Sequence, residues 1–347
     1  MTVQTPAAAE PAIIATTTFE RPALGPWARA ARKLWADKAA MTALAVFILI
    51  VIACVLAPVY ATYIAHTDPF TSNIDGEITV DGQQVQLLQA SDEGLGLGST
   101  PIGPTWDITN YFIGADSQGR DVMARIFYGG RSSLFIAGVS TVICLMLAAL
   151  MGLAAGFFGG IVDTVLSRIL DVIWAFPIFL LAISLSIVLI HGIQVGPITI
   201  ESGSLWLPIV IIGIVYVPYV ARPVRGQVLA LKESEFVLAA TGLGVPSGRI
   251  LFRDILPNVM TTLIVFVPLM LALNMLTESA LSFLSIGVQA PDASWGTIIQ
   301  DGQDVLYVRP WVALAPGICI VLCVLCLNVL GDGVRDALDP RAKLRIH

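Results

Sequence analysis

The chain of 347 residues is 56% hydrophobic and only 13% charged, and it carries a formal net charge of -6. A soluble domain of this length could not bury so much apolar surface, so the composition excludes a water-soluble globular protein. The mean hydropathy of +0.83 instead predicts an all-α polytopic protein that crosses a membrane several times.

Six apolar runs set the predicted membrane-spanning elements, because a helix needs roughly 20 apolar residues to cross the hydrocarbon. The runs are 39–61, 134–158, 172–190, 205–220, 259–276 and 311–330. We therefore expect six transmembrane helices, the first within residues 39–63 and the other five in a core of residues 114–347. Residues 1–38 are predicted to form a tail that is partly disordered, because residues 1–20 show no periodicity.

A long acidic loop is expected after the first helix, over residues 64–113. The wider stretch 64–119 contains eight carboxylates and no Lys or Arg. Within the loop, polar and apolar residues alternate on both sides of Asp81-Gly82, a dipeptide that favours a tight hairpin turn. The pattern predicts a small β-hairpin in this loop.

The distribution of basic residues predicts the orientation of the chain. When the six helices are threaded in order, 15 of the 19 Lys and Arg residues share the side of the N-terminus. The four on the other side are Arg120, Arg125, Arg131 and Arg309. Because cytoplasmic loops are enriched in Lys and Arg, both termini are expected in the cytoplasm and residues 64–113 outside it.

The segment 114–134, before the second run, is basic although it is expected on the outer side. Arg125 stands beside Phe127 and Tyr128, which suits an interfacial helix that extends its arginines to water and buries its aromatic rings. Further along, Gly152 and Gly156 are expected to be helix-packing contacts. The pair at 159–160 is expected to form a turn.

A polar stretch, 234–257, separates the fourth and fifth runs and is expected on the cytoplasmic side as a hinged pair of short helices. An apolar stripe at helical spacing lies on the first of them and suits docking into a groove. The stripe consists of Phe236, Ala239, Ala240 and Leu243.

The ends of these two short helices are also predicted from the sequence. Gly242 and Gly244 are expected to break the first helix, and Ser247 to cap the second with its hydroxyl. Pro257 is expected to stop the second helix after Leu256, because proline has no N–H to donate.

No catalytic, cofactor-binding or metal-binding residue is predicted. The chain contains no Gly-Lys pair, so it has no P-loop and is not expected to hydrolyse ATP itself. Its three histidines lie far apart in the sequence. Cys319, Cys323 and Cys326 have the spacing C-x3-C-x2-C, but they fall within an aliphatic run, where buried thiols behave as small hydrophobic groups.

Three ionisable residues fall within or close to the apolar runs and are candidates for function because a charge in a membrane is costly. Arg168 and Asp171 stand three residues apart on one helix and are expected to neutralise each other. Glu278 lies near the end of the fifth run. It is expected either to reach the outer interface or to serve a gate.

Four motifs together resemble those of the C-type permease subunit of the dipeptide, oligopeptide and nickel ABC importers. The stretch 238–257 is similar to that family's EAA-x3-G-x9-I-x-LP, with Leu238 in place of Glu and Asp254 in place of Ile. Segment 114–134 resembles GTDxxGRDxxSRxxxGxRxSL. The other two matches are ESALSFLSIG at 278–287, with Ser285 where glycine is usual, and NVLGDGVRDALDPR at 328–341.

The resemblance implies a type I ABC importer permease, with the hairpin 234–257 as a coupling element that docks in a groove of an ATPase. It implies ATPase-coupling roles for Phe236, Leu238, Ala239, Ala240, Gly244, Arg249, Arg253, Leu256 and Pro257. The outer-face motif residues are Asp116, Gly119, Arg120, Asp121, Arg125 and Arg131. Glu278 and Ser282 are candidate gate or path residues.

The implied setting is the cytoplasmic membrane of a prokaryote. The expected partners are a homologous second permease, two ATPase subunits that bind ATP and Mg, and an extracytoplasmic substrate-binding protein. Lipid is expected around the helices, and no nucleic acid. This chain is expected to bind no cofactor and to catalyse no reaction.

The expected cargo is a di- or oligopeptide, with nickel chelates, glutathione or another small solute as alternatives. A gradient-driven secondary transporter is a different mechanistic class and is expected to show membrane-embedded charges or an inverted repeat. A membrane enzyme would need a constellation of reactive side chains. An exporter half is normally joined to an ATPase or extended by long cytoplasmic helices. None of these features is recognisable in the sequence.

Overall fold

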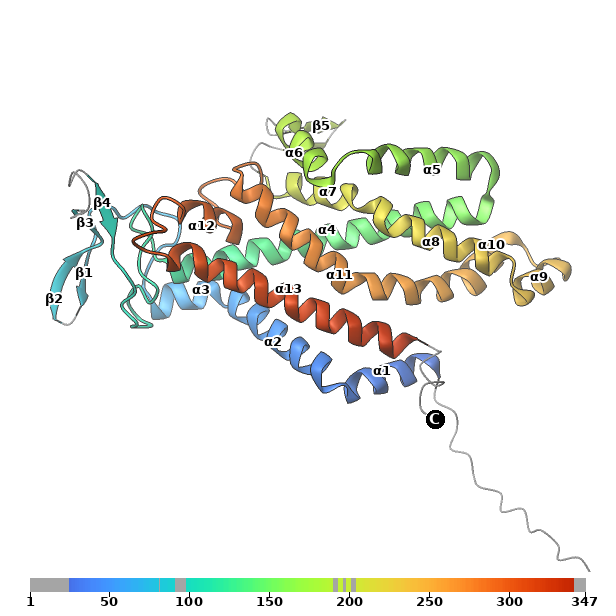
Figure 1. Ribbon diagram of the computed structural model, residues 1–347, viewed down its shortest axis with the longest axis horizontal. Helices are drawn as coiled ribbons and strands as arrows, with labels where there is room; N and C mark the ends of the chain where they lie inside the picture. The colour runs from blue at the N-terminus through green and yellow to red at the C-terminus, as the bar shows by residue number, and fades with distance from the viewer. Residues whose placement is uncertain are drawn as a thin grey trace, which may run out of the picture.

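The computed structural model describes residues 25–80, 82–90, 98–189, 193–195, 198–200 and 204–339. Four helices are long and apolar enough to cross a membrane: α2 (Lys38–Val55), α4 (Val122–Phe158), the continuous stretch Ser247–Phe283 that ends in α11 (Leu256–Phe283), and α13 (Trp311–Leu338). They run side by side along the longest axis of the molecule (Figure 1).

Two further candidate spans are bent pairs of helices. α5 (Gly160–Ala175) and α6 (Ile178–Leu189) meet at 91°, and α7 (Trp206–Val215) and α8 (Val217–Lys232) at 40°. The six predicted spans are therefore present only if each bent pair counts as one. The apolar run 172–190 crosses the sharper bend. Pro177 explains the break, because the residue before a proline avoids the helical region and Phe176 is extended.

Helix α4 is one continuous helix of 37 residues, about 55 Å long at the rise of an α-helix. The prediction of an interfacial helix in segment 114–134 is therefore wrong, because the helix that begins at Val122 continues unbroken through the second predicted span. The carboxylate of Asp121 caps this start by accepting hydrogen bonds from the amides of Met123 (2.8 Å) and Ala124 (3.3 Å). Burial raises the pKa of the Asp121 carboxyl, and these two amide hydrogen bonds lower it in part.

Glycines on α4 set how closely α8 approaches it. A Cβ at Gly152 would lie 2.6 Å from a methyl of Val224, and one at Gly156 would lie 2.7 Å from the Cβ of Val228. These glycines are therefore helix contacts, as predicted. Gly159 and Gly160 both have positive φ and turn the chain from α4 into α5, which was also predicted.

Two ion pairs fasten α5 to α8. The Arg225 guanidinium lies 2.5 Å from the Asp163 carboxylate, and that of Arg222 lies 2.9 Å from Asp171. Arg168, the expected partner of Asp171, is more distant at 3.8 Å and largely exposed. Asp171 therefore pairs more closely across the two helices than along its own helix.

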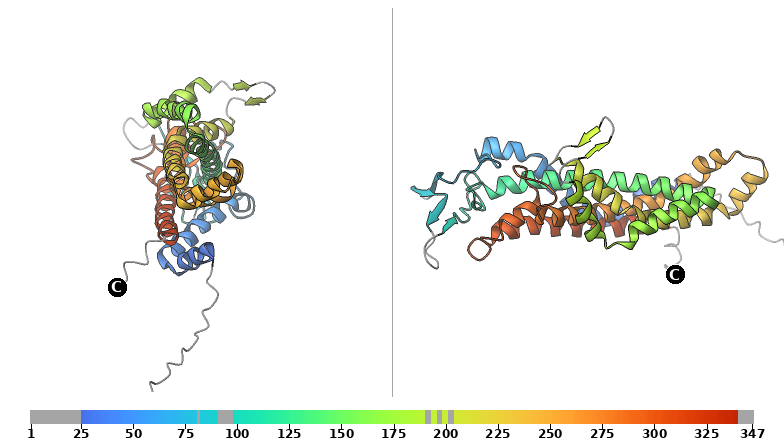
Figure 2. Two further views of the ribbon diagram at one scale, coloured as in Figure 1. Left: turned by 90° about the vertical axis from the view of Figure 1, so that its right-hand side faces the viewer. Right: turned by 90° about the horizontal axis from the view of Figure 1, so that it is seen from above.

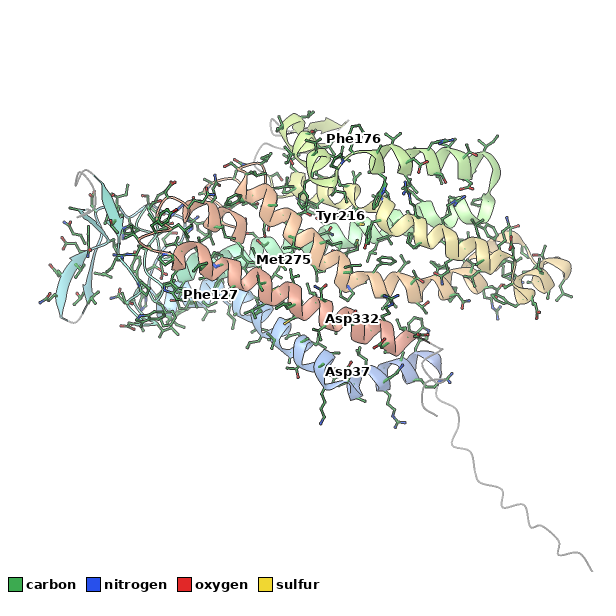
Figure 3. The ribbon with its side chains drawn as sticks, viewed as in Figure 1. Asp37, Phe127, Phe176, Tyr216, Met275 and Asp332 are labelled. Atoms are coloured by element: carbon green, nitrogen blue, oxygen red, sulfur yellow. The ribbon has the colours of Figure 1, made fainter. Side chains whose placement is uncertain are left out.

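The interior of the bundle lies between α4, α7, α8 and α11, where mainly aliphatic side chains pack. Tyr216, which is buried in this cluster, marks the region in Figure 3, whereas Met275 belongs to a second buried cluster with residues of α12 and α13. The Tyr216 hydroxyl shares a hydrogen bond of 2.8 Å with that of Thr277. This hydrogen bond between two helices satisfies both buried hydroxyl groups.

A small lobe occupies one end of the bundle, opposite the helical hairpin of residues 234–257 (Figure 1). After α2 the chain continues through α3 (Ala57–Val59) and a π-helical turn at Tyr60–Ile64. Two antiparallel sheets follow, β1 (Glu77–Val80) with β2 (Gln83–Gln86) and β3 (Leu88–Ala90) with β4 (Ser99–Pro101).

The first of these sheets is the hairpin predicted around Asp81-Gly82. Val80 pairs with Gln83, and Gly82 has the positive φ that the turn requires. A third sheet, β5 (Ile193–Val195) with β6 (Ile198–Ile200), was not predicted. The all-α class therefore holds for the membrane-spanning part, while the connections carry short strands.

Four further short helices belong to the described part. α1 (Pro26–Ala36) precedes α2, α9 (Glu235–Gly242) and α10 (Ser247–Arg249) form the hairpin, and α12 (Trp295–Asp301) lies between α11 and α13. Seen from above in Figure 2, α9 and α10 project past the end of the long helices, at the end opposite β1–β4.

Candidate functional site

The hairpin of α9 and α10 presents apolar side chains to solvent at one end of the molecule. Leu243 is 84% exposed and Phe236 is 48% exposed. They lie on one face of α9, together with the exposed Ala239. Val237 points the other way and is buried, and Ala240 is half-buried. The predicted apolar stripe is thus an exposed face, apart from the contribution of Ala240.

A glycine-dependent turn ends α9. The amide of Val245 donates to the carbonyl of Ala240 (3.1 Å), and that of Gly244 donates to Thr241 (3.0 Å). This pair of bonds is the Schellman arrangement, and it places Gly244 at φ +74°. Gly242 is the last residue of α9 and does not itself break it. Gly244 is therefore the residue at which the chain turns.

The second half of the hairpin differs from the prediction in two ways. Pro246 precedes α10, and Ser247 makes no capping hydrogen bond, so the predicted cap is wrong. Leu256 and Pro257 do not end a helix either. A π-helical turn at Ile250–Ile255 leads directly into α11, where Pro257 occupies the first turn and its missing N–H costs nothing.

The remaining coupling candidates are spread over the hairpin and its base. Leu238, Arg249 and Arg253 are exposed, but Leu238 lies on the opposite side of α9 from Leu243. Leu256 is half-buried and Pro257 is exposed at the start of α11, away from the turn at Gly244. The structure adds Phe252, which is 68% exposed and was not predicted.

The outer-face motif forms a buried ion network at the opposite end of α4. The Asp116 carboxylate accepts from Arg120 Nε (2.8 Å) and from Arg125 Nη1. Both arginines also reach Asp301 at the end of α12, at 3.0 and 2.8 Å. The predicted extension of Arg125 to water is therefore wrong, because its guanidinium is buried among carboxylates.

Asp301 is the member of this network that the sequence did not reveal. It stands 176 residues after Arg125, and no local pattern marks it. Of the other motif residues, Gly119 turns the chain with positive φ, whereas Arg131 is exposed on α4 and is not part of the network. Two arginines facing two carboxylates give the network no formal charge.

Glu278 and Ser282 lie at the junction of α4, α11 and α12, and both are fully buried. The Ser282 hydroxyl donates to Glu278 (2.8 Å) and accepts from the amide of Val288 (3.1 Å). Ser133 and Ser294 also face the carboxylate. Glu278 therefore does not reach the outer interface. Its contacts fasten the three helices together.

The loop that follows explains the departure from the family motif at Ser285. Ser285 has φ +60°, a conformation that glycine adopts more readily. Its hydroxyl accepts a hydrogen bond from Gln300 (2.5 Å), and its carbonyl accepts one from Gln289 (2.9 Å). A serine at this position thus adopts a backbone conformation that glycine adopts more readily, but its hydroxyl gains a hydrogen bond with α12.

We expect Ser282→Ala to lower the free energy of unfolding by about 1–3 kcal/mol, because the Val288 amide loses its partner and Glu278 loses a donor. The thermal unfolding midpoint of the purified protein measures this loss. An unchanged midpoint would contradict this packing role and would leave Ser282 as the gate or path residue that the sequence predicts.

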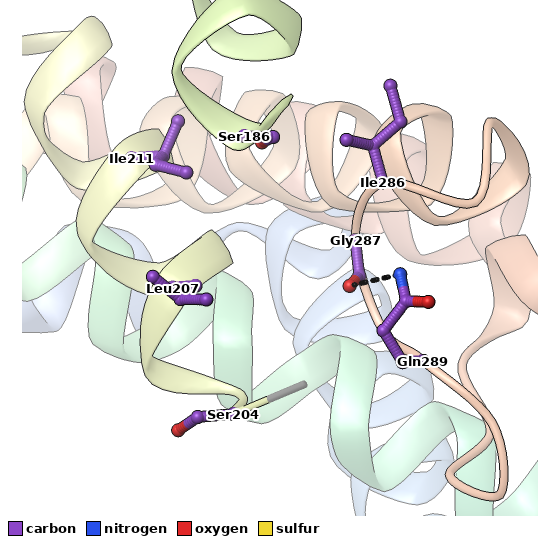
Figure 4. Close-up of a pocket in the computed structure, with 7 residues that line it drawn as sticks. All are labelled: Ser186, Ser204, Leu207, Ile211, Ile286, Gly287 and Gln289. Atoms are coloured by element: carbon purple, nitrogen blue, oxygen red, sulfur yellow. Dashed lines mark hydrogen bonds between the residues drawn. The ribbon is translucent and has the colours of Figure 1, made fainter. Parts of the chain in front are cut away.

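Two cavities lie near the ion network and the loop that follows Ser282. A cavity of about 180 Å³ is lined by Arg120, Arg125 and Asp301 together with polar groups of the loop before α12. A smaller one, about 10 Å³, lies between Ser186, Ser204 and Gln289 (Figure 4).

A groove of about 620 Å³ runs between α8, α11 and α13 and is lined mainly by apolar side chains. Within the described part, no group of three His, Cys, Asp or Glu residues is placed to hold a metal ion.

The arrangement defines a helical membrane protein with a projecting apolar hairpin at one end and a buried ion network at the other. The family described as the binding-protein-dependent transport system inner membrane component matches residues 145–344. A second family, the N-terminal TM domain of oligopeptide transport permease C, matches residues 25–75. The chain belongs to the family of binding-protein-dependent transport system inner membrane components.

Named relatives agree over most of the chain. It is 35% identical over 322 residues to the dipeptide transport system permease protein DppC of Alkalihalophilus pseudofirmus, with 92% of each chain covered. It is 34% identical over 325 residues to the oligopeptide transport system permease protein OppC of Bacillus subtilis, covering 94% and 93%. The glutathione transport system permease protein GsiD of Pectobacterium atrosepticum is 37% identical over 233 residues, covering 67% and 73%.

A solved structure has the same fold. A chain of the MetNI methionine ABC transporter, in an inward-facing conformation, superposes with a TM-score of 0.50 at 18% sequence identity. The match covers 62% of this chain and 97% of that one. At this identity the likeness concerns the fold of the permease core alone.

Proposed function

We propose that this chain is a membrane-spanning permease subunit of an ATP-driven importer that carries di- or oligopeptides across the cytoplasmic membrane of a prokaryote. The observation that carries the proposal is the hairpin, whose apolar face is exposed beyond the ends of the helices. Such a face is costly in water and suits a groove in a protein partner.

The partner that fits this face is a cytoplasmic ATPase subunit. The chain has no P-loop of its own, so in an ATP-driven importer the nucleotide would bind to another polypeptide. Movement of the ATPase would act on the hairpin, which continues through the π-helical turn into α11 without a break. A continuous helix can transmit such a displacement into the membrane as a rigid lever.

A second permease would complete the solute path. The groove between α8, α11 and α13 is lined mainly by apolar side chains and would face that second permease. The lobe of β1–β4, at the end away from the hairpin, would then face outward and meet a substrate-binding protein. In this arrangement both termini lie in the cytoplasm, and ATP and Mg belong to the ATPase subunits.

The cargo follows from the relatives named for dipeptide and oligopeptide transport. Glutathione is a second candidate, because a relative named for its transport is 37% identical over 67% of this chain. Both cargoes are short peptides.

Reconstitution tests the proposal. The chain is purified with its partner permease, ATPases and binding protein, and uptake of labelled dipeptide, oligopeptide and glutathione into proteoliposomes is compared with and without ATP. We expect ATP-dependent uptake of at least one peptide. Uptake driven by an ion gradient without ATPase subunits would contradict the importer proposal and indicate a secondary transporter.

A further inference from the structure

Helix α1 lies directly before the first membrane span and is separated from it by a single residue. The amide of Asp37 donates to the carbonyl of Leu34 and ends α1. The Asp37 carboxylate then accepts from the amides of Ala39 (2.9 Å) and Ala40 (3.2 Å) and starts α2. Asp37 is labelled at this corner in Figure 3. So short a connection holds α1 beside the membrane surface that α2 enters.

One side of α1 contacts the protein. Ala30 and Leu34 are half-buried, and α1 packs against α13 and α2. Lys33 donates a hydrogen bond to the carbonyl of Asp336 on α13. These contacts fix the helix in place and so determine which of its side chains remain uncovered.

A second side is apolar and exposed. Trp27 and Trp35 are 49% and 72% exposed and stand eight residues apart, with Ala31 midway between them. Residues four apart share a helix face, so the two indoles and Ala31 form one strip. Exposed tryptophans next to a transmembrane helix are typical of the headgroup region, where the ring is apolar and its N–H finds water.

The side away from this strip is cationic. It carries Arg29 and Arg32, and α1 contains no acidic residue. Neither arginine has a carboxylate within salt-bridge distance among the residues that the structure describes. This distribution differs from that of the buried arginines near Asp301, which are all neutralised within the protein.

We propose that α1 lies in the membrane–water interface, with Trp27 and Trp35 at headgroup level and with Arg29 and Arg32 bound to anionic phospholipid headgroups. A protein partner is the other occupant to consider. Charge complementarity favours lipid, because one exposed apolar strip and a separate face of cations without a carboxylate partner in the described part are the pattern of an interfacial basic helix. The inference concerns the lipid requirement of this chain and does not depend on its cargo.

Spin labels at two positions test the immersion of α1 in the intact transporter. The label at Ala31→Cys reports the tryptophan strip, and the label at Ala36→Cys is the matched control on the cationic side, where Ala36 is also exposed. The parent, whose described cysteines are buried or half-buried, gives the labelling background. Accessibility to oxygen and to a water-soluble nickel chelate is measured in vesicles of phosphatidylcholine with about 30% phosphatidylglycerol and in phosphatidylcholine alone.

We expect the Ala31 label to be accessible to oxygen and the Ala36 label to the nickel chelate. The immersed population at Ala31 should be larger in the anionic vesicles. Each cation near an anionic surface contributes about fivefold, so Arg29→Gln with Arg32→Gln should reduce the ratio of immersed to exposed label by roughly 25-fold in those vesicles. Arg29→Lys with Arg32→Lys keeps the charge and should restore the ratio.

Two results would overturn the proposal. An Ala31 label that is inaccessible to both reagents in both vesicles would mean that protein covers the strip. An immersed population that is the same with and without phosphatidylglycerol would show that the arginines do not bind anionic lipid. ATP-dependent uptake is not the readout, so neither result bears on the importer proposal.

Discussion

Arg125→Gln should lower the free energy of unfolding by about 3–5 kcal/mol, the largest loss expected from a single substitution in this chain. Arg125 is 2% exposed and bonds to both Asp116 and Asp301. Without its charge, Arg120 alone must neutralise two carboxylates, one of them fully buried. The cost of an unpaired buried carboxylate far exceeds that of a lost surface contact.

Arg131→Gln is the matched control, because it removes the same charge from the same helix at an exposed position. We expect a change within about 0.5 kcal/mol. Thermal unfolding of the purified variants measures both effects. If Arg125→Gln and Arg131→Gln were equally mild, the ion network would not fasten α12 to the start of α4.

Gly156→Leu should be the second most damaging change, with a loss of about 3 kcal/mol. A Cβ at this position would lie 2.7 Å from the Cβ of Val228 and 3.0 Å from the carbonyl oxygen of Arg225. Because one of these neighbours is backbone, α4 and α8 must move apart to admit the side chain.

Gly138→Leu provides the comparison on the same helix, since nothing lies within 4 Å of a Cβ at Gly138. We expect no loss there and a small gain, because leucine favours the helix by about 1 kcal/mol over glycine. Yield and unfolding midpoint of the two variants are compared in one detergent. Equal tolerance at both positions would show that α4 and α8 do not pack as the structure describes.

The membrane-spanning part could be predicted from the sequence because its signal is local. Long apolar runs mark α2, α4, α11 and α13, and glycines four residues apart indicated the helix contact at Gly152 and Gly156. The β-hairpin at β1 and β2 followed from alternation around one turn dipeptide. In each case the deciding residues are neighbours in the chain.

The errors arose where a local pattern was overruled by distant contacts. The arginines and aromatic residues of segment 114–134 have the pattern of an interfacial helix. Arg120 and Arg125 are nevertheless buried, because they form ion pairs with Asp301, which lies far along the chain. Pro257 reads as a helix stop, yet a wide π-helical turn before it lets the helix continue. Nothing in the local sequence signals either outcome.

The central claim is that the hairpin transmits ATPase movement, and Leu243→Asp tests it most directly. Leu243 is the most exposed residue of the apolar face, so a carboxylate there should weaken docking without disturbing the fold. Thr241→Asp is the matched control, because Thr241 is exposed nearly opposite Leu243 on α9.

The measurement is ATP hydrolysis stimulated by the binding protein, made together with peptide uptake in the same proteoliposomes. We expect Leu243→Asp to reduce both by at least about tenfold, which corresponds to roughly 1.4 kcal/mol of docking free energy, and Thr241→Asp to change them little. Normal stimulation and uptake in the Leu243→Asp transporter, assembled at parental levels, would contradict the account.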